Sequence, residues 1–404
     1  MDKRLNIAYV TERDANDRRG APYYVSRALQ AYCGDVHLIH KLRPRISPAY
    51  LLGHPADGFT WVAIPGKLKQ MFWRLRKKKY DWQMTHGAAR YYAGQIDRRL
   101  ANGRYDVIFA EQGSVLLAHL ETSIPIIYSS DATFAAMAGY YSGFSGFAGS
   151  SLRQGHEIER RALERASLFL CHSQWAADSA VRDYGVPPQK VFVLPRFSCL
   201  ENIPDRRAVL MPKQKKICRL LLVGVDWKRK GCEIAVETVN ELNGMGVQAE
   251  LTICGCLPPQ GYAPGRHVML AGYLDKNDAA QRARLEQLYR DASFFILPSR
   301  AECMGNVFVE AAAFGLPVAA TRTGGVPSVV VEGKTGFLLG PEAGGRHYAQ
   351  VIRAAWENQG KYEQMRRGAR SFFESLSAER WGNALLERLR RMLRQGEGRE
   401  AVAQ

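Results

Sequence analysis

The sequence lacks the long apolar runs that membrane-spanning helices need. No window reaches the roughly 18 apolar residues that cross a bilayer. The first residues, MDKRLNIAYVTERD, contain only a short apolar run before polar sequence resumes, too short for the apolar core of a signal peptide. We therefore expect a cytoplasmic protein.

Paired CxxC motifs and the DxD motif are also absent. The eight cysteines are scattered through apolar sequence, and Cys254 and Cys256 form a lone CxC across a glycine, where a turn is expected. Buried free thiols in a reducing compartment are therefore predicted. Without DxD, the usual carboxylate bridge from protein through a metal to a diphosphate is missing, so we expect no metal and no other cofactor.

Acidic residues are too few to balance the basic ones: 39 Asp and Glu stand against 56 Lys and Arg, a formal net charge of +17. Such an excess attracts nucleic acid, anionic lipid or acidic substrates. No motif that reads RNA or DNA accompanies the charge, so no nucleic-acid partner is expected.

Residues 67–80 concentrate this charge, with seven basic residues and no acid. Leu68, Met71, Phe72 and Leu75 recur there at helical spacing. The segment fits a helix on an anionic membrane surface, and it fits equally a solvated helix that packs on its own domain.

What is present indicates a two-domain α/β protein. At 404 residues, the chain is too long for one ordinary hydrophobic core. Its hydrophobic content of 46% is typical of a globular protein. Short apolar runs alternate with longer amphipathic segments, the pattern of parallel βαβ construction. Strands are expected at 5–10, 35–40, 105–110, 124–128, 167–171, 191–194, 217–223, 249–254 and 293–297. Helices are expected at about 20–32, after Ser173 as a cap, from about Gly231 and at 279–291.

A polar, proline-punctuated stretch without helical or strand period separates the two series. We place a linker there, at residues 201–214, between an N-terminal domain of residues 1–200 and a C-terminal domain of residues 215–375. The last segment, 376–404, has an apolar stripe at helical spacing and predicts a helix that either packs back on the first domain or lies on a surface.

The window Phe295–Gly325 carries the most informative pattern. After a buried strand, a short loop contains Glu302 and Gly305, and a helix that bears Glu310 begins near Asn306. Ligands of open α/β domains bind at the carboxyl ends of the strands, where a helix N-terminus favours phosphate. Two carboxylates therefore flank a predicted anion site.

A second window, Leu220–Gly231, contains a buried strand and then three consecutive cations, Lys228, Arg229 and Lys230. Cations beside a helix N-terminus stabilise negative charge that develops on a departing diphosphate.

The spacing Glu302-x7-Glu310, within PSRAECMGNVFVEAAAFGLPVAAT and before GGVPSVVVEGKTGFLL, resembles the signature of the retaining GT-B glycosyltransferases of family 4, or group 1. The resemblance implies two Rossmann-like, doubly wound domains facing a cleft. It also implies that Glu302 binds donor-sugar hydroxyls and that Glu310 binds the ribose. The main-chain amides of Met304, Gly305, Asn306 and Val307 would hold the diphosphate.

The same resemblance extends to other donor-site positions. Lys230 matches the family's lysine beside the leaving group. Many members have an arginine directly after the strand glycine, whereas valine follows Gly224 here, so Arg229 is expected to compensate. Base recognition maps to the main chain of Tyr273 and Leu274.

The N-terminal domain supplies candidates for the acceptor side. Gly20 and Ala21 lie in the loop between the first strand and its helix, where relatives have a glycine-rich loop near the phosphate or acceptor; a plain turn is the alternative. Asp131 follows a strand where many relatives have a histidine near the donor sugar, and its alternative is a cap or turn residue.

The resemblance therefore implies an enzyme that transfers a sugar from a UDP- or GDP-sugar to a hydroxyl of a glycan or lipid-linked acceptor, with retention. Bacterial surface-glycan or glycolipid synthesis, peripheral to the inner face of the plasma membrane, is the expected setting. The alternatives are a sugar-nucleotide epimerase of similar fold and a non-catalytic polyanion-binding protein.

Overall fold

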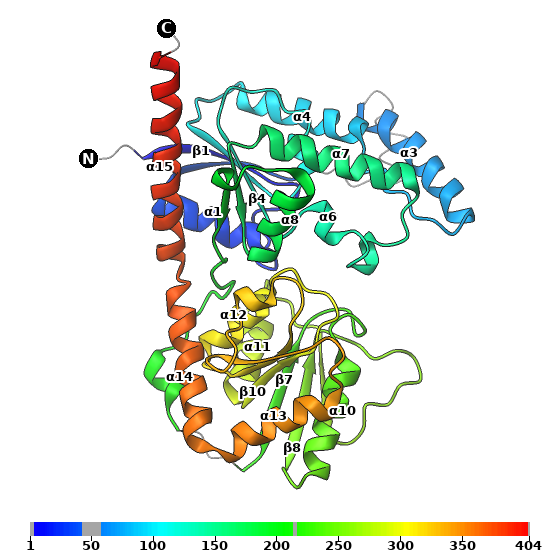
Figure 1. Ribbon diagram of the computed structural model, residues 1–404, viewed down its shortest axis with the longest axis vertical. Coiled ribbons are helices and arrows are strands. Elements are labelled where there is room, and N and C mark those ends of the chain that lie inside the picture. The colour runs from blue at the N-terminus through cyan, green and yellow to red at the C-terminus, as the bar shows by residue number, and fades with distance from the viewer. Residues whose placement is uncertain (1–3, 43–57, 213–215, 403–404) are drawn as a thin grey trace. The chain divides into compact units, whose positions relative to one another are not determined.

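The computed structural model describes residues 4–42, 58–212 and 216–402, and divides into two compact units (Figure 1). The first comprises Met1–Leu194 with Gly382–Gln404, and the second comprises Pro195–Trp381. Each contains one six-stranded sheet in which all neighbouring strands are parallel. The predicted α/β class with two doubly wound sheets is confirmed. No helix among the described residues is long and apolar enough to cross a membrane.

The first sheet has the order β2-β1-β3-β4-β5-β6. Its strands are β1 (Leu5–Val10), β2 (Gly34–Ile39), β3 (Val107–Glu111), β4 (Ile126–Ser130), β5 (Leu168–Cys171) and β6 (Val191–Val193). Its helices include α1 (Ala21–Tyr32), α3 (Gly58–Leu75), α4 (His86–Leu100), α5 (Ser114–Leu117), α6 (Phe134–Met137), α7 (Gly149–Arg165) and α8 (Gln174–Tyr184). The predicted cap of α8 is confirmed, since Ser173 Oγ accepts from the amide of Ala176 at 3.3 Å.

The second sheet has the order β12-β11-β10-β7-β8-β9. Its strands are β7 (Cys218–Val223), β8 (Ala249–Cys254), β9 (Val268–Gly272), β10 (Phe294–Leu297), β11 (Val318–Thr321) and β12 (Gly336–Leu339). Its helices include α10 (Cys232–Gly244), α11 (Ala279–Asp291), α12 (Asn306–Ala313), α13 (Gly345–Glu357) and α14 (Gln359–Ser375). Every strand expected from the sequence forms, with ends within two residues of the prediction.

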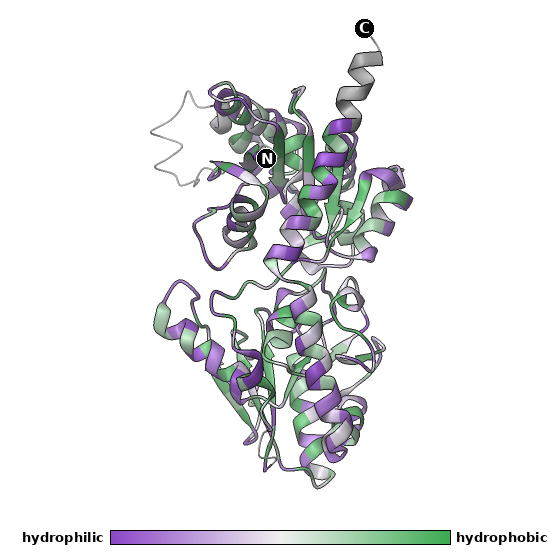
Figure 2. Cartoon of the chain, turned by 90° about the vertical axis from the view of Figure 1, so that its left-hand side faces the viewer, coloured by the Kyte–Doolittle hydropathy of each residue, from purple (hydrophilic) through white to green (hydrophobic). Residues whose placement is uncertain are grey.

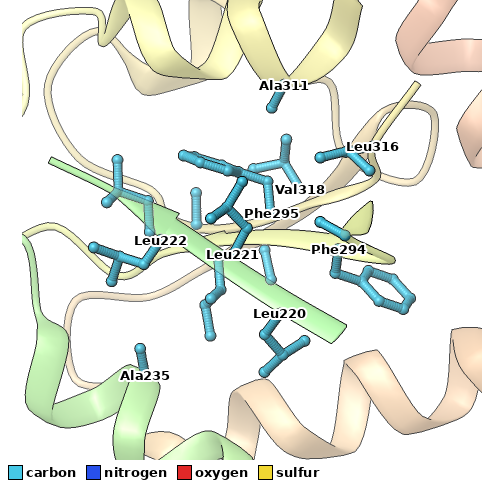
Figure 3. Close-up of a cluster of buried hydrophobic side chains, with 14 of the residues drawn as sticks. Leu220, Leu221, Leu222, Ala235, Phe294, Phe295, Ala311, Leu316 and Val318 are labelled. Atoms are coloured by element: carbon cyan, nitrogen blue, oxygen red, sulfur yellow. The ribbon is translucent and has the colours of Figure 1, made fainter. Parts of the chain in front are cut away.

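The strands are apolar along both faces because helices cover both sides of each parallel sheet. In Figure 2 the strands of both units are mostly hydrophobic, whereas many helices alternate between hydrophilic and hydrophobic residues. In the second unit, Phe295 and Val318 lie toward Ala311 of α12, and Leu220 and Phe294 lie on the opposite side of the strands (Figure 3). The buried sheet is thus a rigid base for the loops at its carboxyl edge.

The expected linker, residues 201–214, contains a short helix, α9 (Arg206–Leu210). Asp205 caps it by accepting from the amide of Ala208 at 3.0 Å. Buried Arg366 donates to the carbonyl oxygen of Met211 at 3.1 Å, and buried Arg370 donates to that of Pro204 at 2.9 Å. These long-range hydrogen bonds hold the segment on the second unit. The periodicity of the local sequence gives no sign of them.

The C-terminal segment forms the helix α15 (Ala378–Val402), which belongs to the first unit from Gly382 on. The thiol of Cys33 donates to the carbonyl of Gly382 at 3.3 Å, and Leu385 and Leu389 are fully buried. A side chain at position 382 would meet Tyr32, with its Cβ 2.5 Å from the Cβ of Tyr32. The glycine therefore permits the close approach of α15 to the end of α1.

Replacing Gly231 by alanine should destabilise the second unit strongly. Gly231 begins α10 with φ 68°, and an added Cβ would lie 2.1 Å from the carbonyl oxygen of Pro298. Gly246 is the matched control, because it has φ 84° and no atom within 4 Å of its Cβ position. Both alanines incur the left-handed backbone cost of about 1 kcal/mol, and only Gly231→Ala adds the steric clash. In urea denaturation we expect Gly231→Ala to lose at least twice the free energy of unfolding that Gly246→Ala loses; equal losses would contradict the close packing.

Candidate active site

The loops that carry the predicted donor residues emerge from neighbouring strands of the second sheet. Strands β10, β7, β8 and β9 are adjacent, so the loops after them share one edge. Gly255, with φ 92°, would place a Cβ 2.3 Å from the carbonyl oxygen of Gly224, and its amide donates to the carbonyl of Gly272 at 2.8 Å. Glycine therefore lets the backbones of these loops pack against one another.

Lys230, Arg229 and Glu302 come together at this edge. Lys230 Nζ donates to Glu302 Oε2, and Arg229 Nη1 lies 3.8 Å from the same oxygen. Lys230 and Glu302 are each only 7% exposed, so solvent screens their charges little. Arg229 also donates to the carbonyl of Ala301 at 3.3 Å and lies 3.5 Å from the more exposed carboxylate of Asp226. Two cations thus converge on one buried carboxylate, and both of them can also interact with an anion that binds beside it.

Glu310 belongs to a second buried ion pair. It is 1% exposed, and its Oε1 accepts from Lys276 Nζ at 2.6 Å while its Oε2 accepts from the hydroxyl of Tyr289 at 3.1 Å. Burial acts to lower the pKa of Lys276, but attraction to Glu310 and the hydrogen bond outweigh it and raise the pKa above 10.5. Sequence reasoning missed Lys276, which lies in the loop between β9 and α11.

The predicted diphosphate loop turns sharply into α12. Gly305 has φ 83°, and a Cβ there would lie 2.7 Å from the ring of Phe308 and 3.2 Å from Glu302 Cγ. No side chain caps α12, so the first amides of the helix, including those of Asn306 and Val307, are available to an anion. Met304 is buried beneath this turn, in the core cluster.

The loop after β9 presents the predicted base-recognition residues. Tyr273 follows Gly272, which has φ 72°, and is 57% exposed. Leu274 is half-buried against the core of the second unit. The structure thus puts this pair at the same sheet edge as the two ion pairs.

In the first unit, Asp131 has a histidine neighbour that sequence reasoning missed. Asp131 follows β4, and its Oδ1 lies 3.8 Å from Nε2 of His172, which follows β5 and is 1% exposed. His172 Nδ1 lies 3.1 Å from the carbonyl oxygen of Leu194 and can only donate to it. Nε2 therefore faces Asp131 and the hydroxyl of Ser129, which is 3.5 Å away. The position of His172 directly after a buried strand is the sequence feature that could have indicated it.

Gly20 and Ala21 open α1 as expected, without a side-chain cap. Gly20 has φ −106°, an extended conformation that any residue adopts, and Ala21 is buried. The backbone conformation at position 20 does not require glycine. The role of this loop near the donor phosphate or the acceptor stays a prediction.

Comparison with known proteins identifies the family of the chain. Residues 218–358 match the family described as "Glycosyl transferases group 1", and residues 23–199 match "Glycosyltransferase Family 4". Together the two matches span most of the chain. The chain belongs to the family 4, group 1 glycosyltransferases.

Two relatives are D-inositol 3-phosphate glycosyltransferases. The enzyme of Corynebacterium diphtheriae is 27% identical over 258 residues, 58% of this chain and 59% of that enzyme. The enzyme of Paenarthrobacter aurescens is 25% identical over 409 residues, 96% of each protein.

Solved structures show the same fold. Sucrose-phosphate synthase from Thermosynechococcus elongatus aligns with a TM-score of 0.65 at 16% identity, covering 97% of this chain and all of that one. HepE from Anabaena, in complex with UDP and glucose, aligns with a TM-score of 0.59 at 16% identity over 95% and 98% of the two chains. The fold is GT-B, as the sequence predicts.

Proposed function

We propose that this glycosyltransferase takes its sugar from a nucleoside diphosphate sugar bound at the carboxyl edge of the second sheet. The observation that carries the proposal is the convergence of Lys230 and Arg229 on Glu302, beside the uncapped N-terminus of α12. UDP is the first candidate nucleotide because the HepE structure contains UDP and glucose, and GDP is the second.

In this proposal the two cations act on the leaving group. The amides that begin α12 hold the diphosphate, and Lys230 and Arg229 stabilise the negative charge that grows as the glycosidic bond breaks. Glu302 then binds hydroxyls of the sugar, and Glu310 binds the ribose. Asp131, with His172 beside it, binds hydroxyls of the donor sugar or the acceptor. The acceptor hydroxyl attacks from the face that the diphosphate leaves, so the product retains the anomeric configuration.

Nucleotide binding tests the donor site directly. In a panel of UDP, GDP, ADP and CMP, we expect one of the three diphosphates to raise the melting temperature of the native protein, since a ligand at 100 times its Kd adds about 2.7 kcal/mol of stability. Glu310→Gln, which keeps the side-chain size, should lose most of this shift. The absence of any shift with the native protein would contradict the proposed donor site.

The acceptor is proposed to be a hydroxyl of a glycan or lipid-linked molecule in bacterial surface-glycan or glycolipid synthesis. The names of the relatives add D-inositol 3-phosphate to the acceptors worth screening. The anomeric configuration of the product, assigned by NMR, tests retention, and inversion would refute it. Conversion of the nucleotide sugar without any acceptor would favour the epimerase alternative.

Transfer is proposed to need no metal ion. The described residues contain no group of three or more His, Cys, Asp or Glu side chains placed to hold a metal, and Lys230 with Arg229 supplies positive charge for the diphosphate. We expect full activity in excess EDTA. Complete loss in EDTA that one divalent ion restores would show this proposal to be wrong.

The protein is also proposed to associate with an anionic membrane surface through residues 67–80. Helix α3 packs on its own unit through buried Ala63 and Gly66, yet Leu68, Met71 and Leu75 on the same helix are 58%, 60% and 82% exposed. A packed helix that leaves large apolar side chains in water among basic residues fits a membrane interface.

A further inference from the structure

A basic pocket lies beside the exposed apolar side chains of α3. Its volume is about 770 Å³, and α3 lies next to α4 in the first unit (Figure 1). Lys67, Met71 and Arg74 of α3 line it, together with Lys78, which follows the helix, and Phe147.

Backbone hydrogen bonds hold the segment that contains Phe147 in place. The amide of Lys79 donates to the carbonyl of Gly146 at 2.8 Å, and the amide of Ala148 donates to the carbonyl of Lys79 at 2.7 Å. The ammonium of Lys79 donates to the carbonyl of Ser142. These bonds join the segment that contains Phe147 to Lys79, four residues after α3 ends, so two parts of the pocket lining are held together.

The pocket is complementary to an anion. In the part of the chain that the structure describes, no carboxylate forms an ion pair with Lys67, Arg74 or Lys78. Asp81 is the one acid in the lining, and its Oδ1 accepts from the amide of Gln83 at 3.0 Å. Four cations, Lys79 included, line the pocket with this one carboxylate, so its net charge is positive.

Exposed apolar side chains adjoin the cations. Ile64, Leu68, Met71, Phe72 and Leu75 follow one another at helical spacing along α3, and all are exposed. We call them the α3 stripe. The phosphates of a nucleic acid would use the cations but would leave the α3 stripe in water. A phospholipid uses both, because its headgroup phosphate and its acyl chains are adjacent.

We infer that this pocket binds the headgroup phosphate of an anionic phospholipid while the α3 stripe inserts beside the acyl chains. The inference rests on the membrane association proposed above and adds a specific phosphate site to it. A diffuse basic surface responds only to the charge density of a membrane. A built site also distinguishes phosphate from other anions of equal charge.

The test is co-sedimentation of the full chain with phosphatidylcholine vesicles that contain either phosphatidylglycerol or, at matched surface potential, oleate. We expect the native protein to prefer the phosphate-bearing vesicles about tenfold. Lys67→Gln with Arg74→Gln should abolish this preference. The matched control, Lys69→Gln with Arg76→Gln, removes the same charge from exposed residues outside the pocket and should keep it.

Each of the other outcomes contradicts one part of the inference. Equal binding to both anionic vesicles by all three proteins would refute the pocket and leave membrane association standing. No binding to any vesicle would refute both. Binding of glycerol phosphate by a native protein that shows no preference for phosphate-bearing vesicles would assign the pocket to a soluble phosphate ester. Duplex DNA that binds as tightly as vesicles, and whose binding the pocket variant loses, would assign the pocket to a nucleic acid. Nucleotide-induced stabilisation, which none of these substitutions touches, reports separately on the donor site.

Discussion

Replacing Lys230 by methionine should lower kcat by about 100- to 1,000-fold, the usual effect of removing one group that stabilises transition-state charge. Lys230 is buried and donates to Glu302, so its ammonium sits in a region of low effective dielectric. The charge on the departing diphosphate grows only as the bond breaks. The loss should therefore fall mainly on kcat, with a smaller change in KM for the donor.

Lys228→Met is the control for this substitution. Lys228 is two residues away in the same loop and is exposed, and its replacement should leave kcat within about twofold. Because Lys230→Met removes a close cationic partner of Glu302 and leaves Arg229 at 3.8 Å, thermal melting must accompany the kinetics. A folded Lys230→Met protein with unchanged kcat would exclude Lys230 from the chemical step.

The sequence was sufficient for nine of the twelve strands that the structure describes and for the place of Lys230 and Glu302 beyond the strand ends. Runs such as those of β7 and β10 are buried on both faces, and a chain buried on both faces must be apolar at successive positions. Lys230 and Glu302 follow these runs within a few residues, beside glycines that the turns require. Local sequence therefore predicts both the strand ends and the side chains just beyond them.

Other parts depend on contacts that are distant in the chain. Lys276 meets Glu310 across 34 residues, and His172 meets Asp131 only because β4 and β5 are neighbours. The helix α9 is only five residues long, too short to show a helical period in the sequence. Arg366 and Arg370 hold the residues that flank it by hydrogen bonds to Met211 and Pro204. Such features follow from the assembled sheet and not from any local pattern.

Removing the ammonium of Lys276 should cost the second unit about 3 to 5 kcal/mol of unfolding free energy, the usual cost of breaking a buried ion pair from one side. Lys276→Met leaves Glu310, 1% exposed, with the hydroxyl of Tyr289 as its remaining side-chain hydrogen bond. The folded-state pKa of Lys276 is raised above 10.5, so its stabilisation is fully present below the unfolded pKa and is lost only as the pH rises through the folded value. The loss should therefore be the same at pH 6 and pH 9, as measured by urea denaturation.

Adding Glu310→Gln to Lys276→Met tests whether the pair serves stability or donor binding. A neutral amide needs no buried counter-charge, so the double variant should regain most of the stability that Lys276→Met loses. It should still bind the nucleotide weakly, because an amide lacks the charge that strengthens a hydrogen bond to the ribose hydroxyls, an effect of about 1.5 to 3 kcal/mol. Recovery of both properties would show that Glu310 does not contact the donor. If neither stability nor nucleotide binding recovers, the unpaired charge of Glu310 is not the cause of the loss. The pair would then contribute through the packing of its side chains.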